Sequence, residues 1–102
     1  MAHKWHLDVT EEAREQLKSL NHQDRALVFR KLRDLLNAEN PTNLDEVTDI
    51  KELKEPKYDG LWRKRAGDWR ILYRIDEISV TIMKVRYKGK LIFTSLLNRR
   101  DL

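Results

Sequence analysis

Arginines on two consecutive short segments are the residues of this chain best suited to chemistry. Arg63 and Arg65 precede a tight turn at Ala66-Gly67-Asp68, and Arg70 and Arg74 follow it. The guanidinium group is always charged, and its planar fork of N–H donors matches the oxygens of a phosphate group. This pattern predicts a site for a phosphate-rich ligand, where positive charge can stabilise a phosphoryl transition state.

Two β-strands, 60–66 and 69–76, are expected to position these arginines. Side chains alternate between the two faces of a strand, so every second residue points the same way. The apolar face of the second strand is formed by Trp69, Ile71, Tyr73 and Ile75. Arg70 and Arg74 fall on the opposite face with Leu72. One face can therefore pack on a core, with Trp62 of the first strand, while the other presents guanidinium groups.

The remaining elements predict an α+β fold. We expect a first strand at residues 4–9, helices near 10–20 and 23–38, and a strand at 78–87. The helices should form a hairpin that covers one face of a small antiparallel sheet. The buried face of the second helix is predicted to be Val28, Phe29, Leu32, Leu35 and Leu36. Segment 40–60 is irregular, with a short helical turn suggested by Val47, Ile50 and Leu53, and segment 91–97 is a strand or a helix.

Length and charge place further bounds on the chain. Its 102 residues suit a single domain, 1–102, with no cysteine for a disulfide or a thiolate metal site. The net charge is +4, but residues 60–90 hold 9 Lys/Arg against 3 Asp/Glu, which favours an anionic partner. No apolar run is long enough to span a bilayer and no signal peptide opens the chain, so we expect a cytoplasmic protein without membrane contact.

Metal and histidine chemistry find little support in the sequence. His3 and His6 lie near the first predicted strand, without an acidic residue at ligand spacing, and His22 lies in a turn. We therefore expect no metal and no cofactor.

The segment from Gly60 to Tyr73 resembles a motif of the RelE/ParE superfamily of bacterial toxins from type II toxin–antitoxin pairs. Superfamily members carry a stretch like Gly-Leu-Tyr-Arg-Leu-Arg-Val-Gly-Asp-Tyr-Arg-Ile-Leu-Tyr, and Trp62 and Trp69 here replace two of its tyrosines. The resemblance extends over the helical hairpin and Val80–Lys88. It implies a fold like that of small microbial ribonucleases and, for the RelE branch, metal-independent cleavage of messenger RNA on the ribosome, which inhibits translation.

The resemblance also implies roles for individual residues. Arg70 matches the motif arginine that contacts the scissile phosphate in RelE-like nucleases, and Arg63 matches a catalytic lysine. Arg86 and Lys88 could supply further charge or a proton, and Tyr87 could stack on a base. The predicted nucleic-acid-binding residues are the other cations of the basic segment, Lys64, Arg65, Arg74, Lys84 and Lys90.

Two departures from the RelE pattern leave alternatives open. Leu61 stands where such nucleases can have a second lysine, and Phe93 or Thr94 stands near an expected C-terminal tyrosine. A ParE-like toxin that binds DNA gyrase and cleaves nothing would fit the same fold, as would an inactive homologue that binds only an antitoxin. In each case the resemblance implies a hetero-oligomer with a cognate antitoxin, and in the RelE case messenger RNA on the ribosome as the target.

Overall fold

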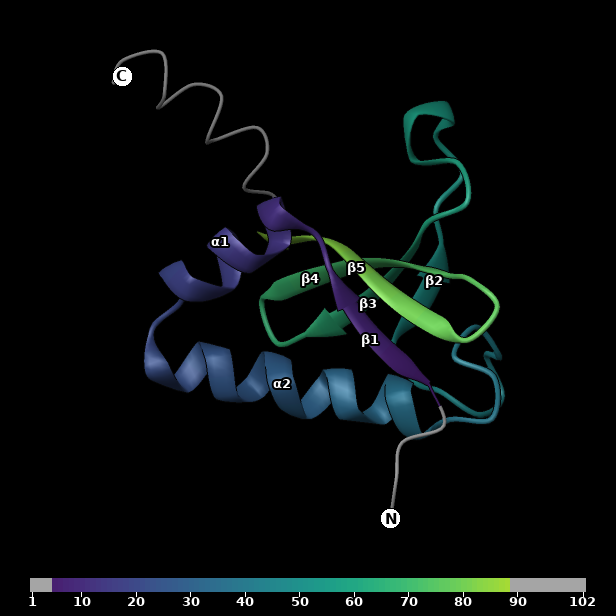
Figure 1. The fold of residues 1–102 in the computed structure, drawn as a ribbon, viewed down its shortest axis with the longest axis horizontal. Helices are drawn as coiled ribbons and strands as arrows, with labels where there is room; N and C mark the ends of the chain where they lie inside the picture. The colour runs from purple at the N-terminus through teal and green to yellow at the C-terminus, as the bar shows by residue number, and fades with distance from the viewer. Residues whose placement is uncertain (1–4, 89–102) are drawn as a thin grey trace.

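The computed structural model of the protein describes residues 5–88, and its elements follow the predicted order closely (Figure 1). A first strand and two helices precede four further strands. The elements are β1 (His6–Val9), α1 (Glu11–Ser19), α2 (His22–Asn37), β2 (Ile50–Glu52), the 3₁₀ helix η1 (Pro56–Tyr58), β3 (Trp62–Ala66), β4 (Trp69–Ile75) and β5 (Ser79–Tyr87). Neither described helix combines the length and apolar character that crossing a bilayer requires.

Side-chain caps fix where both helices begin. The Thr10 hydroxyl accepts a hydrogen bond from the Ala13 backbone N–H at 3.1 Å, and the Asn21 side chain accepts one from Asp24 N–H at 2.8 Å. Each cap satisfies an N–H group that has no partner inside the helix. The connection between the helices is therefore short, as the sequence predicts, and the helices diverge from it as an open V (Figure 1).

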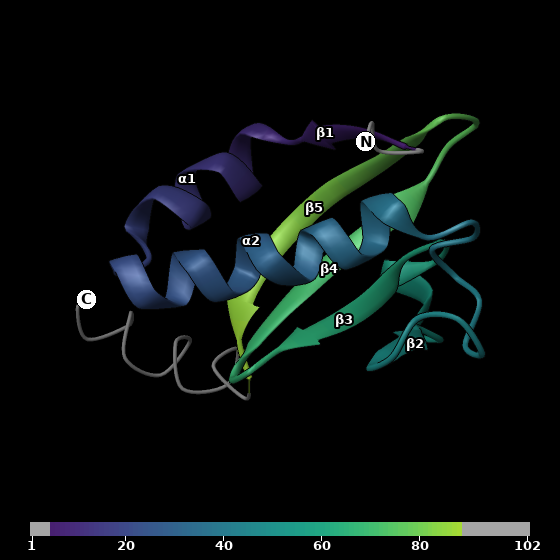
Figure 2. The same cartoon turned by 90° about the horizontal axis from the view of Figure 1, so that it is seen from below.

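Helix α2 crosses one face of the sheet and builds the core with it (Figure 2). Val28, Leu32 and Leu35 are buried with Ile71 and Tyr73, which confirms the predicted apolar face of β4. Trp62 and Trp69 pack partly buried against this core. The prediction for Phe29 was wrong, because its side chain is 42% exposed. The buried stripe of α2 is narrower than predicted, and Phe29 lies beside it.

The sheet is mixed and has five strands, in the order β1-β5-β4-β3-β2. Strands β2 to β5 pair antiparallel, as predicted for β3 to β5. Strand β1 adds a pairing that the sequence analysis did not predict, because it lies parallel to β5, with Leu7 opposite Val80. Local sequence does not predict that pairing, because the helical hairpin and three other strands separate β1 from β5 in the chain.

The segment between α2 and β3 is more regular than the sequence indicates. Val47 and Ile50 are buried, as predicted, but Ile50 begins strand β2 and not a helical turn. The Tyr73 hydroxyl donates a 2.8 Å hydrogen bond to the Pro41 carbonyl, which ties the start of this segment to the sheet. Beyond β2, η1 and Gly60, with φ of 82°, turn the chain back into β3.

Candidate nucleic-acid interface

Three arginines lie directly opposite one another across the three central strands of the sheet, near the β3–β4 turn. Arg65 of β3 pairs with Arg70 of β4, and Arg70 pairs with Arg86 of β5. We call these three residues the arginine row. Like charges directly opposite one another destabilise a sheet. An anion bound between the guanidinium groups would reduce this repulsion. The row lies on the face opposite the helices, since the alternating neighbours of Arg70 are core residues.

Arg63 extends the row along β3 and completes what we call the arginine face. The register places Arg63 beside Lys51 of β2 and beside Leu72, which is fully buried. Burial, and then the charges of Arg65 and Arg70, lower the pKa of Arg63, while Asp49 opposes the shift. The Arg63 Nε atom is buried without a hydrogen-bond partner within residues 5–88. An anion bound beside the exposed part of this guanidinium group would relieve the charge repulsion.

The Arg70 side chain is held in place by the turn that precedes it. Its Nη1 atom donates to the Gly67 carbonyl at 2.9 Å and to the Trp69 carbonyl at 3.0 Å. Gly67 makes the turn possible, because its φ is 63° and a Cβ there would lie 2.8 Å from a methyl carbon of Leu27. These bonds use one nitrogen of the guanidinium, so Nε and Nη2 remain to bind a ligand.

Arg86 is held by a tyrosine that sequence reasoning missed. Its Nη1 atom donates to the Tyr58 hydroxyl at 3.0 Å, and its Cζ atom lies 5.4 Å from the centre of the Tyr58 ring. Tyr58 lies in the irregular connection between β2 and β3, where no periodicity marks a functional residue. Lys51, which lies opposite Arg63, was missed because β2 itself was not predicted. A tyrosine two residues before Gly60 is the only local signal that could have drawn attention to Tyr58.

The carboxylates near the sheet pair with other cations. Asp76 binds Arg74 at 3.4 Å and Asp68 binds Lys88 at 3.1 Å. Glu12 of α1 binds Lys84 at 3.6 Å. No salt bridge between residues 5–88 involves the arginine face, so pairing with Asp68 or Asp76 does not explain Arg63 or Arg70. Within the same range, no group of three or more His, Asp or Glu side chains is placed to hold a metal ion.

Tyr87 and Lys88 do not join the arginines as the sequence suggests. The Tyr87 ring packs edge-on against Trp69, with centroids 5.3 Å apart, and its hydroxyl lies 3.4 Å from Asp68. Lys88 and the Tyr87 hydroxyl together lower the pKa of Asp68, Lys88 having the larger effect. Both residues therefore brace the β3–β4 turn. Lys90 lies outside the described residues.

Lys64 lies on the other side of the sheet from the arginine face. Its side chain is fully buried, and its ammonium group donates to the Thr48 carbonyl at 2.8 Å. Burial lowers the pKa of Lys64, and Asp34 of α2 partly offsets the shift. The prediction that Lys64 binds nucleic acid therefore fails on geometry. Alternation alone predicts this outcome, since Lys64 lies between two residues of the arginine face.

Arg65 and Lys64 are neighbours on β3 but lie on opposite faces of the sheet, so substituting each in turn tests the assignment of the arginine face. Arg65→Met should weaken binding of single-stranded RNA and lower the salt dependence of log K by about 0.7, the value for one lost phosphate contact. Lys64→Met should leave that slope unchanged, because its ammonium group does not reach the arginine face. Fluorescence anisotropy of a labelled RNA over a salt series measures both slopes. Equal slopes for the two variants would contradict the assignment of the arginine face.

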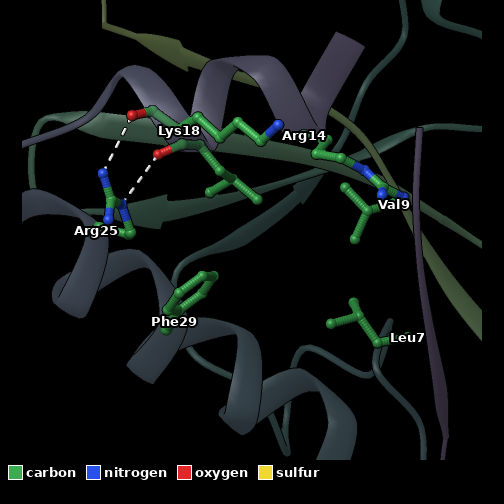
Figure 3. Close-up of a pocket in the computed structure, with 7 residues that line it drawn as sticks. Leu7, Val9, Arg14, Lys18, Arg25 and Phe29 are labelled. Carbon is green, nitrogen blue, oxygen red and sulfur yellow. Dashed lines mark hydrogen bonds between the residues drawn. The ribbon is translucent and has the colours of Figure 1, made fainter. Parts of the chain in front are cut away.

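A second surface feature is an apolar groove between the two helices and β1 (Figure 3). Its volume is about 430 Å³, and Figure 3 shows Leu7 and Phe29 on opposite sides of it. Both side chains are 42% exposed. The groove is lined by Leu7, Val9, Arg14, Leu17, Lys18, Arg25 and Phe29. Arg25 donates to the carbonyls of Leu17, Lys18 and Leu20, and so closes the C-terminal end of α1.

Comparison with known families gives one match along most of the chain. The family model for the ParE toxin of the type II toxin–antitoxin system parDE matches residues 7–91. No curated protein resembles the chain closely enough in sequence to count as a match.

Several solved structures share the fold. The toxin–antitoxin complex RelBE2 from Mycobacterium tuberculosis gives 26% identity and a TM-score of 0.64, over 82% of this chain and 98% of that one. The archaeal RelE–RelB complex from Pyrococcus horikoshii gives 23% identity and a TM-score of 0.64, over 84% and 97%. The YoeB–YefM complex from Staphylococcus aureus gives 18% identity and a TM-score of 0.66, over 81% and 95%. The similarity therefore covers the helical hairpin and the sheet together.

Proposed function

The chain belongs to the ParE toxin family of type II toxin–antitoxin systems, and we propose that this toxin acts by cleaving messenger RNA on the ribosome. The observation that carries the proposal is the arginine face. It gathers four guanidinium groups on one side of a rigid sheet, without a carboxylate paired to any of them within residues 5–88. An RNA backbone is the ligand that matches this charge. The charge of a phosphorane can be stabilised there by guanidinium groups, so cleavage needs no metal ion.

The reaction that suits this face is transesterification at one phosphodiester. The 2′-oxygen attacks phosphorus, the bond from phosphorus to the 5′-oxygen breaks, and the 5′-oxygen takes up a proton. Arg70 and Arg63 are placed to hold the phosphoryl oxygens as negative charge builds on them. Arginine cannot accept the 2′ proton, because its pKa exceeds about 12. That proton therefore passes to a group outside the arginine face, which makes slow cleavage of free RNA and faster cleavage on the ribosome the expected behaviour.

Primer extension on ribosome-bound messenger RNA tests this proposal. Purified toxin should produce discrete new 5′ ends in translated RNA, and its slower cleavage of free RNA should persist in the presence of EDTA. Intact RNA after long incubation with folded toxin that arrests growth in cells would overturn the ribonuclease proposal.

A second candidate function is inhibition of DNA gyrase. The observation that favours it is the family match itself, which carries the ParE name, together with the absence of a lysine at Leu61. A gyrase supercoiling assay with the same protein preparation separates the two. Loss of supercoiling with intact RNA would assign the toxin to gyrase.

The partner we propose is a cognate antitoxin that docks in the apolar groove. Similar solved structures include toxins in complex with RelB or YefM antitoxins. Here the groove offers exposed Leu7 and Phe29 with cations at its rim, so it suits an acidic segment with one apolar face. A segment of that type would order on binding and form a hetero-oligomer with the toxin.

Phe29→Glu should separate neutralisation from toxicity. A carboxylate in the groove opposes an acidic partner and removes an aromatic contact, so antitoxin affinity should fall at least about 30-fold, as for an interface hot spot. Toxicity should persist, because Phe29 lies on the far side of the sheet from the arginine face. Ile78→Glu, at an exposed position in the β4–β5 turn, is the matched control. Isothermal titration with the cognate antitoxin measures the change, and equal affinity for both variants would exclude the groove.

A further inference from the structure

We infer that Tyr58 is a positioning residue of the arginine face, which holds the Arg86 guanidinium in line with Arg70 for contact with the RNA backbone. The inference rests on the proposed ribonuclease function and adds a residue that the toxin motif does not contain. Tyr58 lies in the β2–β3 connection, whereas Arg86 lies on β5, with β4 between β5 and β3 in the sheet. The Tyr58 hydroxyl nevertheless lies 3.0 Å from Arg86 Nη1. The connection therefore reaches over the arginine face.

The backbone around Tyr58 is ordered by its own hydrogen bonds. Tyr58 N–H donates to the Glu55 carbonyl at 2.9 Å, and the Tyr58 carbonyl accepts from Leu61 N–H at 2.9 Å. Leu53 N–H in turn donates to the Leu61 carbonyl at 3.0 Å, which closes the base of the connection. The position of the Tyr58 side chain is therefore set by a closed loop and not by a chance surface contact.

Tyr58 provides Arg86 with a hydrogen-bond acceptor, which the neighbouring arginines cannot provide. Guanidinium groups only donate hydrogen bonds, so Arg86 needs an acceptor to fix its direction, and its neighbour Arg70 repels it. The Tyr58 hydroxyl is that acceptor, and the face of its ring adds a cation–π contact to Arg86 at 5.4 Å. Lys57 lies 5.2 Å from the centre of the same ring and brings a further cation to this edge of the face. The other tyrosine hydroxyls of residues 5–88 are directed elsewhere, to Pro41 and Asp68.

A double-mutant cycle between Tyr58 and Arg86 tests the inference. Tyr58→Phe keeps the ring and removes the acceptor, so single-turnover cleavage on ribosomes should fall about 10-fold or more, as for loss of a hydrogen bond to a charged group. Arg86→Ala should lower this cleavage rate further. In the Arg86→Ala background, Tyr58→Phe should have almost no additional effect, because Tyr58 acts through Arg86. Multiplicative losses, or a Tyr58→Phe rate equal to the parent rate, would overturn the inference while the ribonuclease function stands.

A binding measurement keeps the inference testable if the parent toxin cuts no RNA. Affinity for a short 2′-O-methyl RNA, which cannot be cleaved, should fall in Tyr58→Ala and should show the same non-additivity with Arg86→Ala. Tighter binding by Tyr58→Ala would mean that Tyr58 covers Arg86 and blocks it, which also overturns the inference. Ile78→Ala serves as the control, and thermal unfolding of each variant shows whether the fold is retained.

Discussion

Arg70→Ala should abolish growth arrest and lower the rate of ribosome-dependent messenger RNA cleavage by about 10²–10³, the usual effect of removing one preorganised charge-stabilising donor. The structure places Arg70 at the centre of the arginine row, between Arg65 and Arg86, on the middle strand of the face. Its guanidinium is already fixed by two carbonyls of the turn, so little entropy is lost when it meets a phosphate. Primer extension under single-turnover conditions measures the rate.

The effect of Arg70→Ala should be on chemistry and not on folding. The side chain lies outside the core, and the Gly67 and Trp69 carbonyls that it leaves can bind water, so unfolding free energy should change by no more than about 1 kcal/mol. Arg70→Lys should restore activity only in part, because an ammonium group cannot make a two-pronged phosphate contact. Arg74→Ala, the same change on the same strand at a residue paired with Asp76, should retain most of the activity. Equal losses at Arg70 and Arg74 would indicate a general charge effect and no specific phosphate site.

The sequence predicted the arginine face because strand alternation is a local property. Arg63, Arg70 and the apolar face of β4 could all be placed from period two alone, and both helices could be placed from their apolar spacing. Period two could not predict the register that puts Arg65, Arg70 and Arg86 directly opposite one another. Pairing across strands also depends on turn geometry and on the bulge between Leu72 and Tyr73.

The missed Tyr58 contact and the missed β1–β5 pairing both come from contact between residues distant in the chain. Tyr58 reaches Arg86 from a segment without periodicity, and β1 joins β5 across almost the whole chain. Lys64 was grouped with its neighbours by charge, although alternation points its side chain under α2. Tyr87 was assigned to RNA by analogy, but packing on Trp69 and its contact with Asp68 turn it toward the β3–β4 turn. The distribution of net charge identified the basic half of the chain. Only the tertiary structure showed which of its residues lie on the arginine face and which pack elsewhere.

Tyr73→Ala should be the most destabilising single change among the motif residues, with a loss of about 3–5 kcal/mol of unfolding free energy. Tyr73 is fully buried in the core, and its removal opens a cavity between β4 and the helices. Tyr73→Phe keeps the ring but leaves the buried Pro41 carbonyl without its donor, so it should cost about 1–3 kcal/mol. Urea unfolding followed by circular dichroism measures both values, with the slope m as a check on two-state behaviour.

The pH dependence of stability provides an independent check on Tyr73. Burial raises the pKa of the Tyr73 hydroxyl above its ordinary value of 10.0, so the unfolded chain loses this proton before the folded chain does. The contribution of the neutral hydroxyl is complete below pH 10 and is lost as pH rises toward the folded-state pKa. Above pH 10 the stability of the parent should therefore decline faster than that of Tyr73→Phe, and the gap between them should narrow. A gap that stays constant from pH 8 to 11 would mean that the hydroxyl is not buried against Pro41. Tyr73 would then have a role in the motif other than packing beneath the arginine face.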